Sequence, residues 1–159
     1  MLNPYANFLG DKNQQDVLSS TAARLAEFYK QLGPAGLEKS PAPGKWSPRE
    51  IFAHLADCEI AFAFRLRQTL AEDNHVIQPF DQEHWARTYA AYDASAAVAT
   101  FSAVRRWNLS LIHGISAENL RKSVTHPERG AMTFAAIVET MAGHDLNHLQ
   151  QLEKIQQSQ

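Results

Sequence analysis

Three observations predict an all-α protein, a four-helix bundle. Four segments of about 20–25 residues repeat apolar side chains at steps of three and four, which is the spacing of one helix face. No segment alternates apolar and polar residues over the length of a strand, and Gly and Pro residues separate the four segments. In a chain of 159 residues, four amphipathic helices of this length favour one bundle domain that covers residues 1–159.

The first predicted helix covers residues 13–32. Its apolar face runs from Leu18 to Leu32 at helical spacing, and Gly33 followed by Pro34 is a strong stop signal. We expect a loop rich in Pro and Gly to follow.

The second predicted helix has the clearest start in the sequence. Ser47 can cap it, Pro48 suits its first position, and Glu50 completes a capping box. We expect this helix to reach about residue 72. Its apolar face is formed by Ile51, Leu55, Cys58, Phe62, Leu66 and Leu70.

The rest of the chain supplies two more long helices. A loop with a short helix over residues 82–89 comes first, and a third long helix follows over 94–114. A connection over 121–133 leads to the last helix, which Thr133 caps and which continues to about Ile155.

Charge and cysteine content exclude several classes of function. Fifteen Lys and Arg residues against seventeen Asp and Glu residues leave a net charge of −2, so the basic surface of a nucleic-acid or membrane-surface binder is missing. One cysteine cannot form an internal disulfide or a cysteine-rich zinc site, which favours a reducing compartment. The first residues lack the pattern of a secretory signal, and no apolar stretch reaches the roughly 18 residues that span a bilayer. We therefore expect a cytoplasmic protein.

Three of the seven histidines fall on helix faces that should be apolar. His144 and His148 are four residues apart in the last helix, so they lie on one face, about 5–6 Å apart at Cβ. His54 lies beside the apolar face of the second helix. Because ligands from facing helices meet inside a bundle, we predict a metal site formed by His54, His144 and His148. Taken alone, His54 is more often a hydrogen-bonded core histidine.

A three-histidine site with an open position is typical of catalytic metal ions, whereas structural zinc sites are closed by four ligands that usually include cysteine. Such a metal can lower the pKa of bound water, or hold the thiol of a cosubstrate as the thiolate. The other histidines are expected in loops or near a helix end, away from the metal: His75, His84, His113 and His126.

Polar residues near the three histidines each have two interpretations. Asp57, Glu59 and Asp145 can orient the ligands from behind, or belong to a solvated helix face. Cys58 can be a fourth ligand or a reactive thiol, although a single cysteine on an apolar face is more often a small core residue. Arg65 can bind an anionic group of the substrate, or extend along the surface.

Two further observations concern the interior. Asn108 interrupts the apolar face of the third long helix, where it can line the pocket or satisfy a backbone group. Trp46, Trp85 and Trp107 are expected to anchor loops on the bundle.

Four sequence blocks and one arginine carry a resemblance to a known family. The blocks are KWSPREIFAHLADCE, followed by Arg65, then PFDQEHWA, THPERGAMTF and MAGHDLNHLQQLEKI. Their order and spacing resemble the DinB-like superfamily, in particular its YfiT-type branch, from the first helix to about Ile155. The combination of Trp-Ser-Pro, His-Leu-Ala-Asp and a final His-Asp-x-x-His-Leu is specific to that pattern.

The resemblance implies a four-helix bundle that binds a divalent metal ion, commonly zinc or nickel, through His54, His144 and His148. It also implies homodimers. Related activities include transfer of low-molecular-weight thiols such as bacillithiol to electrophiles, isomerisation with a thiol cofactor, and metal-dependent hydrolysis. The substrate does not follow from the resemblance, because it depends on pocket residues outside the blocks.

Two classes of function are therefore expected. The first is a metal-dependent enzyme with a small-molecule substrate, either a transferase that joins a low-molecular-weight thiol cosubstrate to an electrophile, or a hydrolase that uses metal-bound water. Arg65 would position an anionic group in either case. The second is a non-catalytic metal-binding stress or interaction protein, because the sequence supplies no evident general acid or nucleophile besides the metal. A side chain such as Cys58 in the open metal position would favour the second class.

Overall fold

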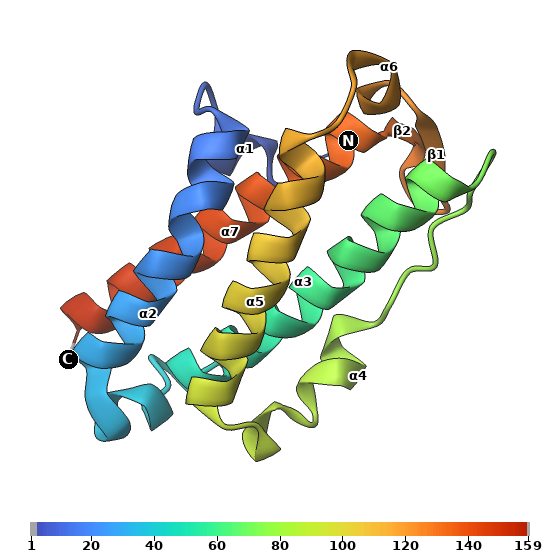
Figure 1. Cartoon of the computed structure of the whole chain (residues 1–159). Helices are drawn as coiled ribbons and strands as arrows, with labels where there is room; N and C mark the ends of the chain where they lie inside the picture. The colour runs from blue at the N-terminus through green and yellow to red at the C-terminus, as the bar shows by residue number, and fades with distance from the viewer. Residues whose placement is uncertain (1–2, 159) are drawn as a thin grey trace.

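Four long helices pack along one another in the computed structural model, which describes residues 3–158 (Figure 1). They are α2 (Gln14–Glu38), α3 (Pro48–Ala71), α5 (Ala94–His113) and α7 (Phe134–Gln157). Both α2 and α3 pack against α5 and α7. The predicted all-α class and four-helix bundle are confirmed.

The starts of α3 and α7 follow the capping signals of the sequence. Ser47 precedes α3, and its Oγ accepts a hydrogen bond from the backbone N–H of Glu50. The Glu50 carboxylate accepts from the backbone N–H of Ser47 at 2.8 Å, which completes the predicted capping box. Thr133 caps α7 through the backbone N–H of Ala136. Local chemistry thus fixes where the two helices that carry the histidines begin.

The helix α2 is longer than predicted because helical turns resume beyond its stop signal. Gly33 has φ 63° and ψ 175°, which lie outside the helical region, and Pro34 follows it. Glycine accepts a positive φ at little cost because it has no Cβ. The break therefore occurs at the predicted position, but residues 34–38 form a further helical turn where a loop was expected.

Short helices occupy the connections between the long ones. The predicted short helix is present as α4 (Gln82–Ala86), followed by a 3-10 turn, η1 (Tyr89–Ala91). Two further helices, α1 (Ala6–Leu9) and α6 (Ala117–Leu120), have no counterpart in the sequence prediction. Four residues are too few to show a helical repeat, so their sequences carried no periodic signal.

A two-stranded hairpin lies near the start of α7 (Figure 1). The strands β1 (Ser123–His126) and β2 (Gly130–Thr133) pair antiparallel. Only a connection was expected here, because an alternation over four residues is too short to predict a strand. Val124 and Met132 pair across the hairpin, and both are buried against the bundle. The hairpin is therefore part of the packed structure at this end of the bundle.

The apolar core consists of two clusters with polar residues between them. One cluster takes in the first part of α2, the second half of α3 and the first half of α7, while the other takes in the opposite halves of these helices. Most of the buried polar side chains lie along the helices at or near the junction of the two clusters: Thr21, His54, Glu59, Arg105, Asn108, His144, Asp145 and His148. This polar layer contains the candidate site.

No helix within residues 3–158 has both the length and the apolar character needed to cross a membrane.

Candidate metal centre

The structure brings the three predicted ligand histidines together inside the bundle. His54 projects from α3, and His144 and His148 project from α7. Their ring centroids lie 5.1 Å apart for His54 and His144, 4.7 Å for His54 and His148, and 4.5 Å for the pair on α7. None of the three residues is more than 4% exposed. The assignment of these residues as metal ligands stays a prediction, but the proximity on which it depends is present.

Hydrogen bonds around the cluster direct ring nitrogens toward its centre. The Nε2 atoms of His54 and His144 are 3.1 Å apart. Behind them, His54 Nδ1 lies 3.3 Å from the hydroxyl of Tyr89, and His148 Nδ1 lies 3.1 Å from the amide oxygen of Gln151. Since an amide oxygen only accepts, His148 carries its hydrogen on Nδ1 and keeps the lone pair of Nε2 free. Hydrogen bonds to the outer nitrogen orient metal-binding histidines in this way.

All three imidazoles are neutral at pH 7. Burial, and to a smaller extent the neighbouring His148, lower the pKa of His54 to about 3. Burial lowers the pKa of His148 to about 4, although the hydrogen bond to Gln151 opposes that shift. The pKa of His144 is held well below its usual value, mainly by burial. Because a metal ion binds the unprotonated imidazole, this set of donors fits a divalent cation.

Cys58 lies directly against the cluster. Its Sγ atom is 3.5 Å from His54 Nε2, and ligand atoms of His54, Cys58 and His144 all lie within 4.8 Å of one another. The side chain is also buried in the apolar cluster that contains Phe62. Burial raises the pKa of its thiol, so that without a metal the sulfur stays protonated at neutral pH. Cys58 is therefore a buried core residue whose sulfur also lies within ligand distance of the histidine nitrogens.

The carboxylates of Glu59 and Asp145 bind a buried arginine rather than the histidines. Arg105 donates two hydrogen bonds to each carboxylate, at 2.7 and 2.9 Å to Glu59 and at 2.6 and 3.1 Å to Asp145. Asn108 donates to Glu59 at 2.8 Å and accepts from Arg67, so it neither lines the pocket nor satisfies a backbone group. These residues form a salt-bridge cluster that ties α3, α5 and α7 together.

The third candidate carboxylate, that of Asp57, lies away from this salt-bridge cluster. Asp57 is half-buried and lines a separate cavity together with Tyr92 and Asp93. Burial raises the pKa of its carboxyl group. The hypothesis that acidic residues orient the histidines from behind is wrong for Glu59 and Asp145, because their oxygens are taken up by other side chains.

Two cavities flank the histidine cluster. The smaller, of about 130 Å³, has His144, Cys58 and Arg65 in its wall. The larger, of about 680 Å³, has His148 and Trp46 in its wall. The candidate site is thus reached from two sides, and half-buried Arg65 faces the cavity beside Cys58 instead of extending along the surface.

Several residues of the site gave no signal in the sequence. Tyr5 lines both cavities and its ring contacts His144 edge-on at a centroid distance of 5.1 Å. It can approach because position 143 is glycine: a Cβ on Gly143 would lie 2.6 Å from the Tyr5 carbonyl oxygen. Tyr89 and Gln151 orient the histidines through the contacts given above. Tertiary packing, and not a sequence motif, brings these residues to the site.

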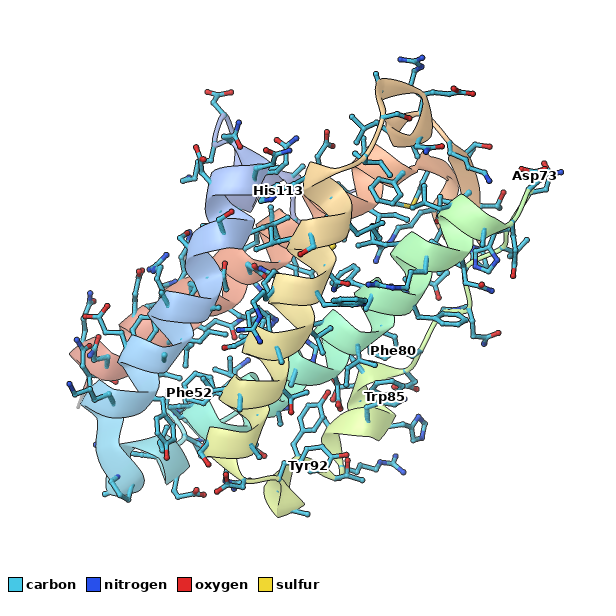
Figure 2. All side chains as sticks on the ribbon, viewed as in Figure 1. Phe52, Asp73, Phe80, Trp85, Tyr92 and His113 are labelled. Carbon is cyan, nitrogen blue, oxygen red and sulfur yellow. The ribbon has the colours of Figure 1, made fainter. Side chains whose placement is uncertain are left out.

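The tryptophans agree only partly with expectation. Trp46 packs on His54 at a ring distance of 4.7 Å, and Trp85 packs on Phe80 at 4.5 Å (Figure 2). Trp107 is 68% exposed on α5, so its prediction as a loop anchor is wrong.

The four remaining histidines lie outside the cluster. His75 and His84 pair with acidic residues on the surface, and His113 lies at the C-terminal end of α5 (Figure 2). His126 is buried and lines the smaller cavity, although its sequence position had indicated only a loop.

The chain is similar in sequence to proteins of a known family. The model of the DinB superfamily matches residues 18–152. A protein of Oceanobacillus iheyensis named "Putative metal-dependent hydrolase OB0782" is 28% identical over 114 residues, which cover 71% of this chain and 66% of that protein, slightly under two thirds. A "Putative metal-dependent hydrolase" of Bacillus cereus is 29% identical over 127 residues, 78% of this chain and 72% of that protein.

A solved structure shares the fold. YfiT from Bacillus subtilis, described as "a probable metal-dependent hydrolase with an unusual four-helix bundle topology", superposes with a TM-score of 0.85 over 91% of this chain and 85% of that one. The two sequences are 19% identical, so this likeness concerns the fold alone.

Proposed function

The chain belongs to the DinB superfamily, and from this membership and the buried histidine cluster we propose that it is a metal-dependent enzyme acting on a small molecule. In its most specific form, the proposal is a transferase that joins a low-molecular-weight thiol to an electrophile. Hydrolysis is the alternative reaction. The observation that carries it is the convergence of three neutral imidazoles beside two cavities. Such a site can bind a cation and still be reached by a small molecule.

We propose zinc or nickel as the ion, because neutral imidazoles suit both. His54, His144 and His148 would hold it. When bound, a divalent ion supplies a Lewis acid that lowers the pKa of a water molecule or of a thiol.

The chain's own side chains prepare this site for a reactant. Tyr89 and Gln151 hold two of the rings in place through their outer nitrogens. Trp46 packs on His54 and, at a ring distance of 6.4 Å, stacks over His148, so its indole forms part of the wall of the larger cavity next to these two rings. Arg65 offers a positive charge in the smaller cavity, whose wall also contains His144. A reactant with an anionic group is therefore favoured.

Metal analysis tests the ligand assignment. We expect His148→Ala to lose most of the bound metal after dialysis, because one of three ligands is gone. His126→Ala is a stringent control, since His126 lines the same cavity as His144 and is not a proposed ligand. Equal metal content in the two variants would contradict the assignment of His148.

An activity panel tests the reaction. Metal-loaded protein would be assayed for consumption of several low-molecular-weight thiols with monochlorobimane as acceptor, and in parallel for hydrolysis of small esters and amides. Thiol consumption that disappears in His148→Ala supports the transferase, and hydrolysis without thiol consumption supports a hydrolase. No turnover of either kind by protein that retains its metal would refute the enzyme proposal.

A second candidate, a closed metal-binding protein without catalysis, is favoured by one observation. Cys58 Sγ lies close enough to the histidine nitrogens to act as a fourth ligand, and four ligands are typical of structural sites. Cobalt-substituted protein separates the two candidates. A thiolate-to-metal absorption band in the protein alone, absent in Cys58→Ser, identifies the closed site. We expect no such band until an external thiol is added.

We also propose a homodimer. Two neighbouring helices carry large exposed apolar side chains, namely Ile60 (48% exposed) and Phe64 (58%) on α3 and Trp107 (68%) on α5. A second copy packed over these side chains would remove them from water. Sedimentation velocity should give a dimer for the wild type and a monomer for Phe64→Glu. A wild-type monomer at all concentrations would refute this proposal.

A further inference from the structure

The smaller cavity carries an excess of positive charge. Arg65 reaches it from α3, and Arg129 reaches it from the turn between β1 and β2, while His144 of the histidine cluster forms another part of the wall. Glu128, an exposed residue of the same turn, is the acidic residue among the described lining residues. Two guanidinium groups against one exposed carboxylate leave the cavity with a positive charge.

We propose that this cavity is a subsite for a carboxylate or phosphate group of the substrate, bound by Arg65 and Arg129 with His126 as a neutral donor. This inference rests on the proposed function, because the anion would belong to a molecule that reacts at the neighbouring histidines. It adds two residues, Arg129 and His126, that are not part of the metal centre.

Neither arginine has a carboxylate partner within the described part of the chain, residues 3–158. Arg65 donates one hydrogen bond, to the backbone oxygen of Gln78 at 3.2 Å, and its guanidinium lies 5.9 and 5.5 Å from the rings of Phe62 and Phe80. Arg105 differs from them, since it donates four hydrogen bonds to two carboxylates and a fifth to the backbone oxygen of Leu18. Arg65 and Arg129 keep donors available for a ligand.

Holding two cations at one cavity is unfavourable in the absence of an anion. Arg65 is half-buried, and burial lowers its pKa, with the charge of Arg129 acting in the same direction. Like charges in a partly dehydrated site repel more strongly than in water. A bound anion would remove that repulsion and could accept paired hydrogen bonds from each guanidinium group.

His126 adds a donor without adding a charge. Its Nδ1 accepts a hydrogen bond from the backbone N–H of Glu128 at 3.2 Å, so the ring hydrogen is on Nε2. Burial, and then the charges of Arg129 and Arg65, lower the pKa of His126, which keeps the ring neutral at pH 7. A neutral N–H donor beside two guanidinium groups is suited to an oxyanion.

The volume limits what this subsite can hold. About 130 Å³ accommodates the charged end of a small acid but not a whole cosubstrate. Tyr5 and Gln82 line both this cavity and the larger one of about 680 Å³, so the rest of the molecule has space in the adjacent larger cavity.

Calorimetric titration with succinate and, separately, inorganic phosphate tests the subsite directly, on metal-loaded protein with its metal content measured. We expect saturable binding of at least one anion and at least about tenfold weaker binding to Arg129→Gln, which loses the charge and keeps a polar side chain. Binding of succinate identifies a carboxylate subsite, and binding of phosphate alone identifies a phosphate subsite. The absence of saturable binding of either anion up to about 50 mM would overturn the proposal.

Two further variants make the result specific. Arg121→Gln removes an exposed arginine outside the cavity and should bind the anion like the wild type. Arg65→Gln should weaken binding as Arg129→Gln does, and unchanged affinity in both cavity variants would also overturn the proposal. Neither variant should lose metal. If the protein binds the anion but turns over no substrate, the enzyme proposal fails while the subsite stands.

Discussion

Removal of the buried arginine should destabilise the protein strongly. Arg105 is 1% exposed and donates five hydrogen bonds, two to Glu59, two to Asp145 and one to the backbone oxygen of Leu18. In Arg105→Met the two carboxylates stay buried without their counterion. Breaking a buried ion pair in this way costs about 3–5 kcal/mol. For a chain of this size, that corresponds to a melting temperature roughly 6–20 °C lower.

Urea unfolding of the metal-free protein, followed by circular dichroism, measures this free energy. Arg106→Met is the matched control, because Arg106 is the next residue of α5 and is exposed; its cost should stay within about 0.5 kcal/mol.

A triple variant identifies the cause of the loss. With Glu59 and Asp145 replaced by Met and Leu in the Arg105→Met background, no uncompensated charge remains, and most of the lost stability should return. The reasoning is refuted if Arg105→Met costs no more than Arg106→Met, or if the triple variant is less stable than the single one. Either result would mean that uncompensated charge on the buried carboxylates is not the cause of the effect of Arg105→Met.

Three other changes have defined outcomes. Gly143→Ala should displace the Tyr5 segment, because the new Cβ would lie 2.6 Å from the backbone oxygen of Tyr5. Faster hydrogen exchange of the backbone amides near Tyr5 would show the displacement, and unchanged exchange rates would contradict the contact. The metal-free protein should lose stability as pH falls below about 6.5, since the unfolded chain protonates its histidines there, whereas His54 and His148 in the folded protein resist protonation to about 3 and 4. The unfolded state therefore binds more protons in this window, which costs up to about 1.4 kcal/mol per pH unit for each histidine, and a urea midpoint that stays constant from neutral to acid pH would refute this. Cys58→Ala should leave metal content unchanged, and loss of metal would instead assign Cys58 as a ligand.

Much of the fold was predictable because its signals are local. The capping box at Ser47 and Glu50 and the cap at Thr133 depend on atoms within one helical turn, so α3 and α7 begin where the sequence indicates. The hairpin at 123–133 and the short helix α1 were missed, because each strand or helix has only four residues and shows no repeat.

The candidate site was predictable only in part. The helical spacing of His144 and His148, and the position of His54 on a core-facing helix, were sufficient to expect the cluster that the structure contains. The partners that orient the rings were not predictable: Tyr89 is 35 residues from His54 in the chain, and no local pattern links them.

The sequence by itself determined the helices, their apolar faces and the three inward histidines, because these follow from spacing and capping within single helices. Only the tertiary structure decided where Glu59 and Asp145 point, since both could have served the histidines until Arg105 from α5 was placed between them. It also brought Arg129 from a hairpin to Arg65 on α3 in one cavity. Contacts between distant segments depend on how the helices pack and in which order they meet, and periodicity within one helix does not encode that.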